Sequence, residues 1–322
     1  MSLKSVHYDD VIMKILITGV HGFVGSNLVD YLKKDNVIYG LDIISPEKEG
    51  VVKTFSWEEF ASLPECDAII HLAGKAHDTK NKAAADVYFK VNTGLTQKIF
   101  DYFLASKAKK FVFFSTAKAA ADRVEGVLTE DVVPSPVGPY GESKIKAEGY
   151  ILAQQLSEEK QVYILRPCMI HGPGNKGNLN LLYGVVSKGI PWPLGAFENR
   201  RTFTSIENIC FAVNGLLTKE VESGIYNMGD DEALSTNELI KVICDTLGKK
   251  ARIWRISKGF MTGCARVGGW LHLPLNPDRL QKLTENYVSS NEKIKKALGV
   301  DKMPVSAKDG LVRTIQSFRD KR

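Results

Sequence analysis

The sequence lacks the features that mark membrane-spanning, metal-binding and disulfide-stabilised proteins. No apolar run reaches the roughly 18 residues that a membrane-spanning helix needs. The five cysteines are odd in number, widely spaced and without a CxxC pair, which is typical of free thiols in a reducing compartment. The six histidines show no metal-ligand spacing, so we expect no metal site.

Extremes of composition are absent too. The 322 residues include 12 Pro and 27 Gly, and 44% are hydrophobic and 25% charged, which predicts a large folded core. The net charge of +6 is spread along the chain and is densest at residues 107–110 and 249–252. Because no nucleic-acid recognition motif accompanies these clusters, we interpret them as solvated helix ends and loops. We therefore expect neither nucleic acid nor a membrane as a partner, whereas an anionic small molecule would suit the mild positive charge.

The first twelve residues are polar and lack the apolar region of a signal peptide. Met13 directly precedes the first apolar segment, so residues 1–12 are interpreted as a leader or a cloning remnant. Without a targeting signal, and with free cysteines, the protein is expected to be cytoplasmic.

Strands alternate with helices through the first half of the chain. β-branched and aromatic runs predict strands, and apolar residues at helical spacing predict helices between them. The expected strands are residues 14–18, 37–42, 67–73, 110–115 and 162–166, and the expected helices are 23–34, 87–108 and 140–156. This alternation predicts an α/β fold, a Rossmann-type doubly wound parallel sheet covered by helices on both faces.

After residue 167 the composition changes to loops rich in Gly, Asn and Pro around one expected helix, 179–188. Residues 225–229 predict a strand that returns to the sheet, and Ser235 with Glu238 forms a capping box for the next helix. We therefore expect a Rossmann domain over 13–167, to which 201–229 return. A smaller substrate-binding lobe, 168–200 and 230–322, is expected over the carboxyl edge of the sheet, where α/β sheets bind ligands.

A glycine motif lies between the first strand and the first helix. Gly19, Gly22 and Gly25 would let the backbone turn tightly and approach a pyrophosphate at the helix N-terminus. Asp42 ends the second strand, where a carboxylate accepts hydrogen bonds from ribose hydroxyls and repels a 2′-phosphate. The motif therefore predicts NAD rather than NADP. The alternative is that Asp42 is an ordinary exposed acid at a strand end.

Tyr140 and Lys144 are four residues apart in an expected helix, so their side chains share one face. An ammonium near a phenol favours the phenolate, and a tyrosine tuned in this way exchanges a proton with an alcohol or ketone. Thr116, at the end of the fourth strand, is placed to hold the oxygen of a substrate against Tyr140. The alternative is a surface pair without function.

Other motifs complete a recognisable order along the chain. These are residues 71–74 (HLAG) after a strand, 91–94 (VNTG) in the following helix, 114–116 (FST), 165–167 (LRP) and 171–174 (HGPG). With the glycine motif and the Tyr140/Lys144 pair, the chain resembles the extended short-chain dehydrogenases/reductases. Within them it is similar to the sugar-nucleotide epimerase/dehydratase group that includes UDP-glucose 4-epimerase. The resemblance covers nearly all of the chain from Met13 onward.

The resemblance implies a role for each matching residue. Tyr140 would be the catalytic acid/base, Lys144 would orient the nicotinamide ribose, and Thr116 would be the third catalytic residue. The cofactor, NAD, would be contacted by Gly19, Gly22, Phe23, Val24, Gly25, Asp42, Leu72, Ala73, Gly74, Asn92, Tyr140, Lys144 and Pro167. The substrate, a nucleoside-diphosphate sugar, would be contacted by Lys75, Thr116, His171, Asn178 and Arg201. Asp67, before the third strand, would lie close to the adenine.

The chain departs from the family pattern at two places. Residues 119–121 are three alanines where the family usually has Val-Tyr-Gly, so the sugar pocket is expected to be wider or differently lined. His171 replaces the tyrosine that is common before Gly-Pro. Arg201 matches the diphosphate-binding arginine of the family, with a structural ion pair as the alternative. Arg200 beside it is either a second contact or a solvent-facing neighbour.

Several other residues are interpreted more plainly. His21 is expected to fill the glycine loop, and Cys168 to be a buried thiol near the nicotinamide rather than a nucleophile. His77, like Lys75, follows the third strand and is a candidate substrate contact. Trp192 and Phe197 would either stack on the base of the nucleotide or pack in the core.

The leading hypothesis for function is a nucleoside-diphosphate-sugar 4-epimerase that oxidises C4 transiently, with a UDP-hexose or UDP-N-acetylhexosamine as substrate. A 4-keto-sugar-nucleotide reductase that consumes NAD(P)H would use the same residues and stays an alternative. A 4,6-dehydratase is disfavoured because Ala117 and Lys118 stand where that reaction wants Asp-Glu. A non-catalytic NAD-sensing protein is disfavoured because Tyr140 and Lys144 are both present. The resemblance further implies a homodimer formed through the helices at 87–108 and 140–156.

Overall fold

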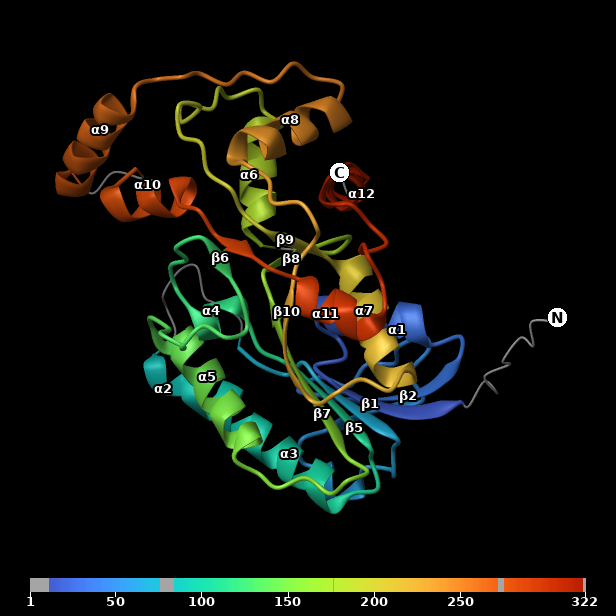
Figure 1. Cartoon of the computed structure of the whole chain (residues 1–322). Coiled ribbons are helices and arrows are strands. Elements are labelled where there is room, and N and C mark those ends of the chain that lie inside the picture. The colour runs from blue at the N-terminus through green and yellow to red at the C-terminus, as the bar shows by residue number, and fades with distance from the viewer. Residues whose placement is uncertain (1–11, 76–83, 176, 272–274, 321–322) are drawn as a thin grey trace, which may run out of the picture. The chain divides into compact units, whose positions relative to one another are not determined.

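The computed structural model describes residues 12–75, 84–175, 177–271 and 275–320 (Figure 1). The expected leader and His77 therefore lie outside the described residues, apart from Ile12. The chain divides into two compact units. Unit 1 contains the chain up to Phe114 with Lys146–Ile164 and Glu222–Gly224, and unit 2 contains Ser115–Ile145, Leu165–Val221 and the chain from Ile225 onward. The expected domain boundary at residue 167 stays a prediction.

The central element is a parallel seven-stranded sheet in the order β10–β7–β5–β4–β1–β2–β3. Its strands are β1 (Met13–Thr18), β2 (Asn36–Asp42), β3 (Lys53–Ser56), β4 (Ala68–His71), β5 (Lys110–Phe114), β7 (Gln161–Pro167) and β10 (Gly224–Met228). The expected Rossmann-type sheet and its return strand are confirmed. β3 was not foreseen, because only Phe55 of its four residues is buried.

The helices of unit 1 are α1 (Phe23–Leu32), the short η1 (Phe60–Ser62), α2 (Ala85–Tyr88), the π-helical η2 (Phe89–Gly94) and α3 (Leu95–Ala105). In this unit, α1 connects the neighbouring strands β1 and β2, and the helical segments from α2 to α3 connect the neighbouring strands β4 and β5. The chain moves outward from β1 to β2 in one direction and from β4 to β5 in the other. Right-handed crossovers therefore place α1 and α3 on opposite faces of the sheet, as Figure 1 shows.

The long helix expected at 87–108 is interrupted. A π-helical segment, η2, separates α2 from α3 and contains the buried Asn92. Such segments are rare and often lie at functional sites. The main-chain carbonyl of Asn92 accepts a hydrogen bond from the Thr96 hydroxyl at 2.6 Å. Apolar spacing alone did not reveal this break, since both halves keep the same helical period.

Unit 2 consists mainly of helices with two small sheets, β6 with β11 and β8 with β9. The elements are α4 (Ala117–Ala120), β6 (Val127–Leu128), α5 (Pro139–Leu152), β8 (Met169–His171), α6 (Asn178–Val186), β9 (Phe203–Ser205), α7 (Ile206–Thr218), α8 (Thr236–Thr246), α9 (Lys258–Trp270), α10 (Pro277–Thr284), β11 (Val288–Ser289), α11 (Glu292–Leu298) and α12 (Ala307–Arg319). Helix α5 begins in unit 2 and continues into unit 1. One apolar cluster joins α6, α8 and α12 through Tyr183, Ile243 and Leu311. The expected capping box at the start of α8 is confirmed, with Glu238 N donating to Ser235 Oγ at 3.1 Å and Ser235 N to Glu238 Oε2 at 2.7 Å.

None of the helices in the described part of the chain combines the length and the apolar character needed to cross a membrane. Among the same residues, no group of three or more His, Cys, Asp or Glu side chains is arranged to hold a metal ion.

Candidate functional site

The turn after β1 has no room for a Cβ at its first and last glycines. Gly19 has a φ of 71°, in the left-handed region, and a Cβ there would lie 3.0 Å from the backbone nitrogen of Ala73. A Cβ on Gly25, in the first turn of α1, would collide with the carbonyl oxygen of Gly19. Gly22 is the N-cap of α1, and no side chain caps this helix. The structure therefore places an uncapped helix N-terminus behind a tight backbone turn, an arrangement suited to a phosphate group.

Asp42 lies against this turn. One carboxylate oxygen, Oδ2, accepts a hydrogen bond from the backbone nitrogen of His21 at 2.9 Å, and Oδ1 accepts one from Ile43 N at 2.7 Å. The ring of His21 contacts Thr54 Oγ1 at 3.2 Å, in keeping with a residue that fills the loop. Each carboxylate oxygen keeps a further lone pair, so Asp42 is able to accept hydrogen bonds from a ligand while it supports the turn.

Thr18, directly before the turn, is a residue that sequence reasoning missed. Its hydroxyl oxygen accepts hydrogen bonds from Leu72 N at 3.2 Å and Ala73 N at 3.0 Å, and it lies 2.7 Å from His71 Nδ1. The Thr18 hydroxyl therefore ties the end of β1 to the loop after β4. The only sequence signal was a threonine at the carboxyl end of a buried strand.

The buried ring of His71 links Thr18 to Thr96. His71 Nε2 lies 3.0 Å from Thr96 Oγ1, whose own hydrogen is donated to the carbonyl of Asn92. Thr96 therefore accepts from Nε2–H, and Nδ1 accepts from the Thr18 hydroxyl, so the hydrogen-bond pattern assigns a neutral ring. This chain of bonds connects the glycine turn with the π-helical segment.

Asn92 holds the loop that contains Lys75. Its Oδ1 accepts a hydrogen bond from Lys75 N at 2.7 Å, and its Nδ2 donates one to Lys75 O at 3.2 Å. The ammonium of Lys75 lies 5.8 Å from the centre of the Tyr88 ring. Unit 1 thus brings together the glycine turn, Asp42 and the 71–75 loop at the carboxyl ends of β1, β2 and β4.

Thr116, Tyr140 and Lys144 all belong to unit 2. Thr116 is the N-cap of α4, and its hydroxyl accepts a hydrogen bond from Lys118 N at 3.3 Å. Tyr140 lies in the first turn of α5, and Lys144, whose side chain is buried, follows one turn later. A Cβ on Gly141 would lie 2.7 Å from the carbonyl oxygen of Lys118. The first turn of α5 therefore packs directly against the turn that begins at Thr116.

The three alanines of α4 and its end are packed rather than exposed. Ala120 and Ala121 belong to an apolar cluster with Tyr287, and Ala119 is fully buried. Tyr287 donates its hydroxyl hydrogen to the carbonyl of Ala121 at 2.8 Å. Of the two expectations for the sugar pocket, a wider pocket is not supported, because Tyr287 from the C-terminal part of the chain fills the space beside these alanines. A differently lined pocket stays a prediction.

The thiol of Cys168 packs at the same cluster. Burial raises its pKa to about 12, so it is protonated at neutral pH and is not a nucleophile. The raised pKa agrees with the unreactive thiol that the sequence predicted, in a residue that is partly buried. Its distance from a nicotinamide stays a prediction.

Arg201 forms the ion pair that was considered as its alternative role. Its Nη2 donates to Glu285 Oε1 at 3.0 Å, and both side chains are largely buried. Its backbone bridges to Leu234 and Tyr287. Arg200 is exposed and donates to the carbonyl of Ala233 at 3.2 Å. A diphosphate at Arg201 would therefore have to replace or join the carboxylate of Glu285.

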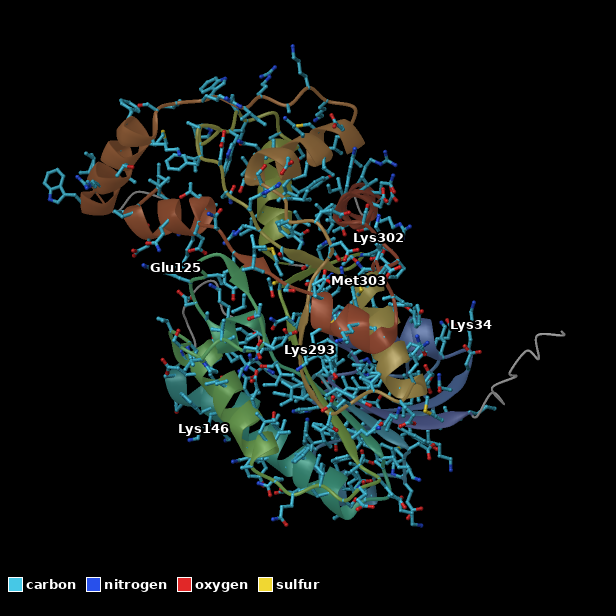
Figure 2. All side chains as sticks on the ribbon, viewed as in Figure 1. Lys34, Glu125, Lys146, Lys293, Lys302 and Met303 are labelled. Carbon is cyan, nitrogen blue, oxygen red and sulfur yellow. The ribbon has the colours of Figure 1, made fainter. Side chains whose placement is uncertain are left out.

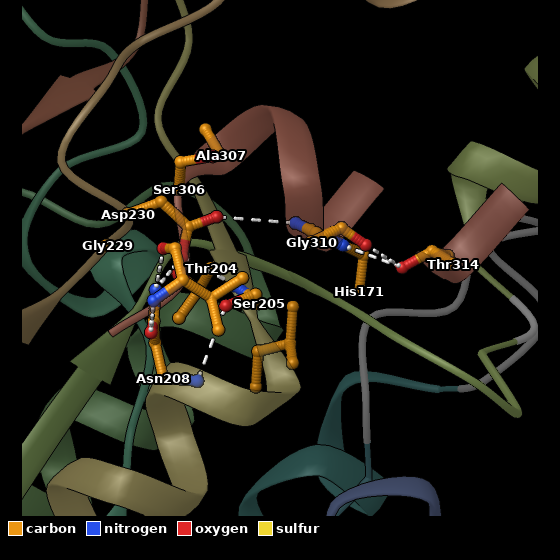
Figure 3. Close-up of polar contacts among 12 residues, drawn as sticks. His171, Thr204, Ser205, Asn208, Gly229, Asp230, Ser306, Ala307, Gly310 and Thr314 are labelled. Atoms are coloured by element: carbon orange, nitrogen blue, oxygen red, sulfur yellow. Dashed lines mark hydrogen bonds and ion pairs between the residues drawn. The ribbon is translucent and has the colours of Figure 1, made fainter. Parts of the chain in front are cut away.

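His171 is fully buried in a polar network of unit 2 (Figure 3). Its Nδ1 lies 3.0 Å from Thr314 Oγ1 and its Nε2 lies 3.4 Å from Asp230 Oδ2. Asp230 Oδ1 in turn accepts hydrogen bonds from Ser205 N at 2.9 Å and Asn208 Nδ2 at 2.7 Å. This placement gives His171 a packing role between β8 and α12 and leaves its side chain no exposed surface for a substrate.

Comparison with known proteins identifies the family. The model of the NAD-dependent epimerase/dehydratase family matches residues 15–229. The UDP-glucose 4-epimerase of Vibrio cholerae is 30% identical over 324 residues, which cover 94% of this chain and 95% of that protein. The chain belongs to the NAD-dependent epimerase/dehydratase family. It is an NAD-dependent enzyme of the sugar-nucleotide epimerase/reductase class.

Two further similarities accompany this membership of the epimerase/dehydratase family. The N-acetyl-alpha-D-glucosaminyl-diphospho-ditrans,octacis-undecaprenol 4-epimerase of Escherichia coli O157:H7 is 25% identical over 327 residues, 94% of each chain. The crystal structure of the UDP-glucuronic acid 4-epimerase from Bacillus cereus in complex with NAD matches with a TM-score of 0.72 and 21% identity, over 96% of this chain and 99% of that one. The structural likeness shows the shared fold.

The residues after β1 fit the cofactor of the epimerase/dehydratase family. A Cβ at Gly19 or Gly25 would fill the space that lets the backbone come close to a pyrophosphate, and α1 begins without a side-chain cap. Asp42 lies at this turn with acceptor capacity for ribose hydroxyls. Unit 1 therefore offers the donor and acceptor groups that NAD requires.

The other predicted cofactor- and substrate-binding residues are described here by the elements in which they lie. Phe23 and Val24 begin α1, Leu72, Ala73 and Gly74 form the loop tied to Thr18, Pro167 ends β7, and Asn178 is the first residue of α6. Trp192 and Phe197 are partly buried and pack against an apolar cluster of unit 2, which agrees with core packing. Stacking on the base of the nucleotide stays a prediction.

The expectation that Asp67 lies near the adenine is wrong. Asp67 Oδ2 accepts a hydrogen bond from Lys14 N at 2.7 Å, at the amino end of β1. The glycine turn follows Thr18, at the other end of the same strand. Parallel pairing of β1 with β4 therefore puts Asp67 at the edge of the sheet opposite the turn.

Proposed function

We propose that the protein is a nucleoside-diphosphate-sugar 4-epimerase. The observation that carries this proposal is the packing of Gly141 on the Lys118 carbonyl, because it keeps the turn of Tyr140 against the turn capped by Thr116. We infer that this packing places the Tyr140 phenol beside the Thr116 hydroxyl, the arrangement that oxidation and reduction of a sugar carbon requires.

In the proposed reaction, the phenolate oxygen of Tyr140 accepts the proton of the sugar 4-hydroxyl and later returns it. The ammonium of Lys144 favours the phenolate, and the hydroxyl of Thr116 donates a hydrogen bond to the reacting oxygen. NAD, when bound, supplies a reversible hydride acceptor for C4. The 4-keto sugar turns over before reduction, so the new C–H bond forms on the opposite face.

The dinucleotide and the substrate would be held by separate groups of this chain. The glycine turn holds the pyrophosphate, and Asp42 accepts from the adenosine ribose, which favours NAD over NADP. Arg201 binds the diphosphate of the substrate bidentately in place of its contact with Glu285. Lys75, Asn178 and His171 were further candidates for substrate binding, and of these we retain Lys75 and Asn178.

Turnover assays with UDP-glucose, UDP-galactose and their N-acetyl forms test the proposal, followed by NMR of the product at C4. Interconversion without net change in NADH absorbance is expected. The undecaprenol diphosphate sugar acted on by the Escherichia coli relative belongs in the same panel. Stoichiometric NADH oxidation with a 4-keto sugar would establish the reductase instead, and no activity with any of these substrates would overturn the 4-epimerase.

The Tyr140→Phe variant tests whether the phenol oxygen takes part in the reaction. Loss of the phenol oxygen is expected to lower kcat by about 10² to 10⁴ while the substrate still binds. Retained turnover in this variant would remove Tyr140 from the reaction.

A further inference from the structure

The net positive charge of this protein corresponds to the excess of basic residues in one segment. Residues 249–285 contain eight Lys and Arg and two acidic residues, an excess of six that equals the net charge of +6 for the whole chain. The rest of the chain is therefore neutral in sum. This differs from the expectation of a charge excess spread along the chain, because acidic residues elsewhere balance the other basic clusters.

The segment follows one edge of unit 2. In Figure 1 it runs from the end of α8 through an extended stretch to α9 and α10, away from α12. The stretch is held by backbone hydrogen bonds, from Trp192 N to Arg252 O at 2.8 Å and from Trp254 N to Trp192 O at 2.8 Å. The side chain of Trp254 is nevertheless exposed. Figure 2 shows side chains projecting outward along this stretch and α9.

Helix α9 has apolar residues on two faces. Met261 and Ala265 are buried in an apolar cluster with Leu280 of α10. The opposite face carries an exposed stripe at positions i, i+7, i+10 and i+11, which share one side of a helix. Its members are Phe260, Val267, Trp270 and Leu271, and Trp270 is 81% exposed. A helix in water normally keeps its second face polar, so this stripe indicates a contact outside unit 2.

Basic residues accompany the exposed stripe and the extended stretch. Arg266 lies on α9 beside the stripe, Lys258 begins the helix with its ammonium 5.9 Å from the centre of the Phe197 ring, and Arg255 directly follows Trp254. At the start of the extended stretch, a cavity of about 320 Å³ is lined by Lys188, Lys249, Lys250 and Arg252 together with apolar side chains. Lys249 keeps its place by donating to the carbonyl of Ser187 at 2.6 Å. An apolar stripe and basic side chains on one segment, with a basic cavity at the start of that segment, complement anionic headgroups above acyl chains.

We propose that residues 249–271, which we call the basic–aromatic segment, dock on an anionic lipid surface. Trp254, Phe260 and Trp270 enter the interfacial layer, and the lysines and arginines contact lipid phosphates. A second copy of this chain is a poorer occupant, because a symmetric contact would bring the same basic residues face to face. The proposal replaces the expectation of no membrane partner, and it does not rest on the proposed 4-epimerase activity.

Flotation with lipid vesicles tests the docking. The full chain is mixed with vesicles of phosphatidylcholine alone, or of phosphatidylcholine and phosphatidylglycerol in equal parts. Binding is expected to the mixed vesicles only, and to weaken at high salt because the charges of the surface are screened. Absence of binding to the mixed vesicles at low salt overturns the proposal.

Variants separate the two contributions. Phe260→Glu with Trp270→Glu is expected to weaken binding at least tenfold, since apolar insertion is lost. Lys258→Gln with Arg266→Gln is expected to weaken it roughly tenfold and to reduce its salt dependence. The control is Val133→Glu with Val137→Glu, an equal change of charge at two sites in unit 2 that are also exposed. Equal binding by all these variants contradicts the docking.

A fluorescent probe reports the depth of insertion. Cys264 is exposed on α9, between Phe260 and Val267, and accepts an environment-sensitive label. Its emission is expected to shift to the blue with the mixed vesicles. Sedimentation velocity gives the other outcome: a dimer of the wild type that Trp270→Glu dissociates, with no vesicle binding, would identify a second copy as the occupant and overturn the lipid proposal.

Discussion

Asn92 and Lys75 are joined by two hydrogen bonds, in which the side-chain amide of Asn92 pairs with both the backbone N–H and the backbone carbonyl of Lys75. Asn92 itself lies in the π-helical segment, and its carbonyl accepts from Thr96. Thr96 contacts His71, which contacts Thr18. One polar chain therefore positions the loop after β4 relative to the glycine turn.

Substitutions at Asn92 test this connection. Asn92→Leu removes both hydrogen bonds and is expected to weaken NAD binding, because the loop that carries residues 72–75 loses its anchor. Asn92→Asp keeps the acceptor for Lys75 N but places a carboxylate oxygen near Lys75 O, so an intermediate effect is expected. Isothermal titration with NAD provides the measurement. Wild-type affinity in Asn92→Leu would show that the amide does not position a cofactor-binding loop.

Gly141 and Gly149 offer a matched pair within α5. A Cβ on Gly141 would lie 2.7 Å from the Lys118 carbonyl oxygen, whereas a Cβ on Gly149 meets no atom within 4 Å. Gly141→Ala is expected to lower kcat, since it pushes Tyr140 away from Thr116, and to reduce stability by about 1–3 kcal/mol. Gly149→Ala should raise stability by about 0.5–1 kcal/mol without changing kcat. Unfolding in urea and steady-state kinetics measure both, and an equal response of the two variants would contradict the packing argument.

Asp231 makes stability depend on pH. Burial, the largest influence, raises the pKa of its carboxyl, but hydrogen bonds from Asn291 and from Met303 N, together with Lys295, outweigh burial and lower the pKa below the ordinary 3.8. Because the folded-state pKa is depressed, the stabilisation is present above the unfolded pKa and is lost as pH falls through the folded pKa.

The Asp231→Asn variant reveals this contribution. At neutral pH it is expected to lower the free energy of unfolding by about 1–3 kcal/mol, because the charge-assisted bonds are lost. Urea unfolding at decreasing pH should show the difference between wild type and variant shrinking only below the unfolded pKa. A difference that stays constant under acid conditions would assign the effect to packing.

The cysteines are expected to differ in reactivity. Burial raises the pKa of Cys66 and of Cys168 to about 12, and Cys210 and Cys244 are also buried. Cys264 is exposed on α9. A small alkylating reagent at mildly alkaline pH should therefore modify Cys264 first, because the reactive form is an accessible thiolate. Mass spectrometry of the labelled peptides measures this, and the Cys264→Ser protein should remain unmodified over the same time.

Local patterns along the chain were enough to predict most of unit 1. β-branched runs ending in glycine or a polar residue located β1, β2, β4, β5 and β7, because a buried parallel strand needs continuous apolar side chains. The alternation with helices then determined a parallel sheet, since right-handed crossovers leave few other topologies. The Ser235/Glu238 capping box located the start of α8 by the same local logic.

Contacts between residues far apart in the sequence could not be predicted from local patterns. Tyr287 fills the space beside Ala121 from 166 residues away, Glu285 pairs with Arg201 across 84 residues, and Asp230 faces His171 across 59. Each partner is an ordinary residue in its own neighbourhood, so no short pattern distinguished it. The π-helical break at Asn92 escaped because the apolar spacing on both sides of it keeps the same helical period, and the side-chain bonds of Asn92 go to the distant Lys75.

The amino-acid sequence by itself determined the parallel sheet and the glycine turn, because backbone geometry and hydrophobic burial leave patterns within short segments. The order of these segments and motifs along the chain was enough to indicate the family. Only the tertiary structure decided that residues 119–121 are packed, that His171 is buried and that the apolar stripe of α9 faces outward. These properties depend on which surfaces meet when segments far apart in sequence come together, and that information is not carried by any one segment.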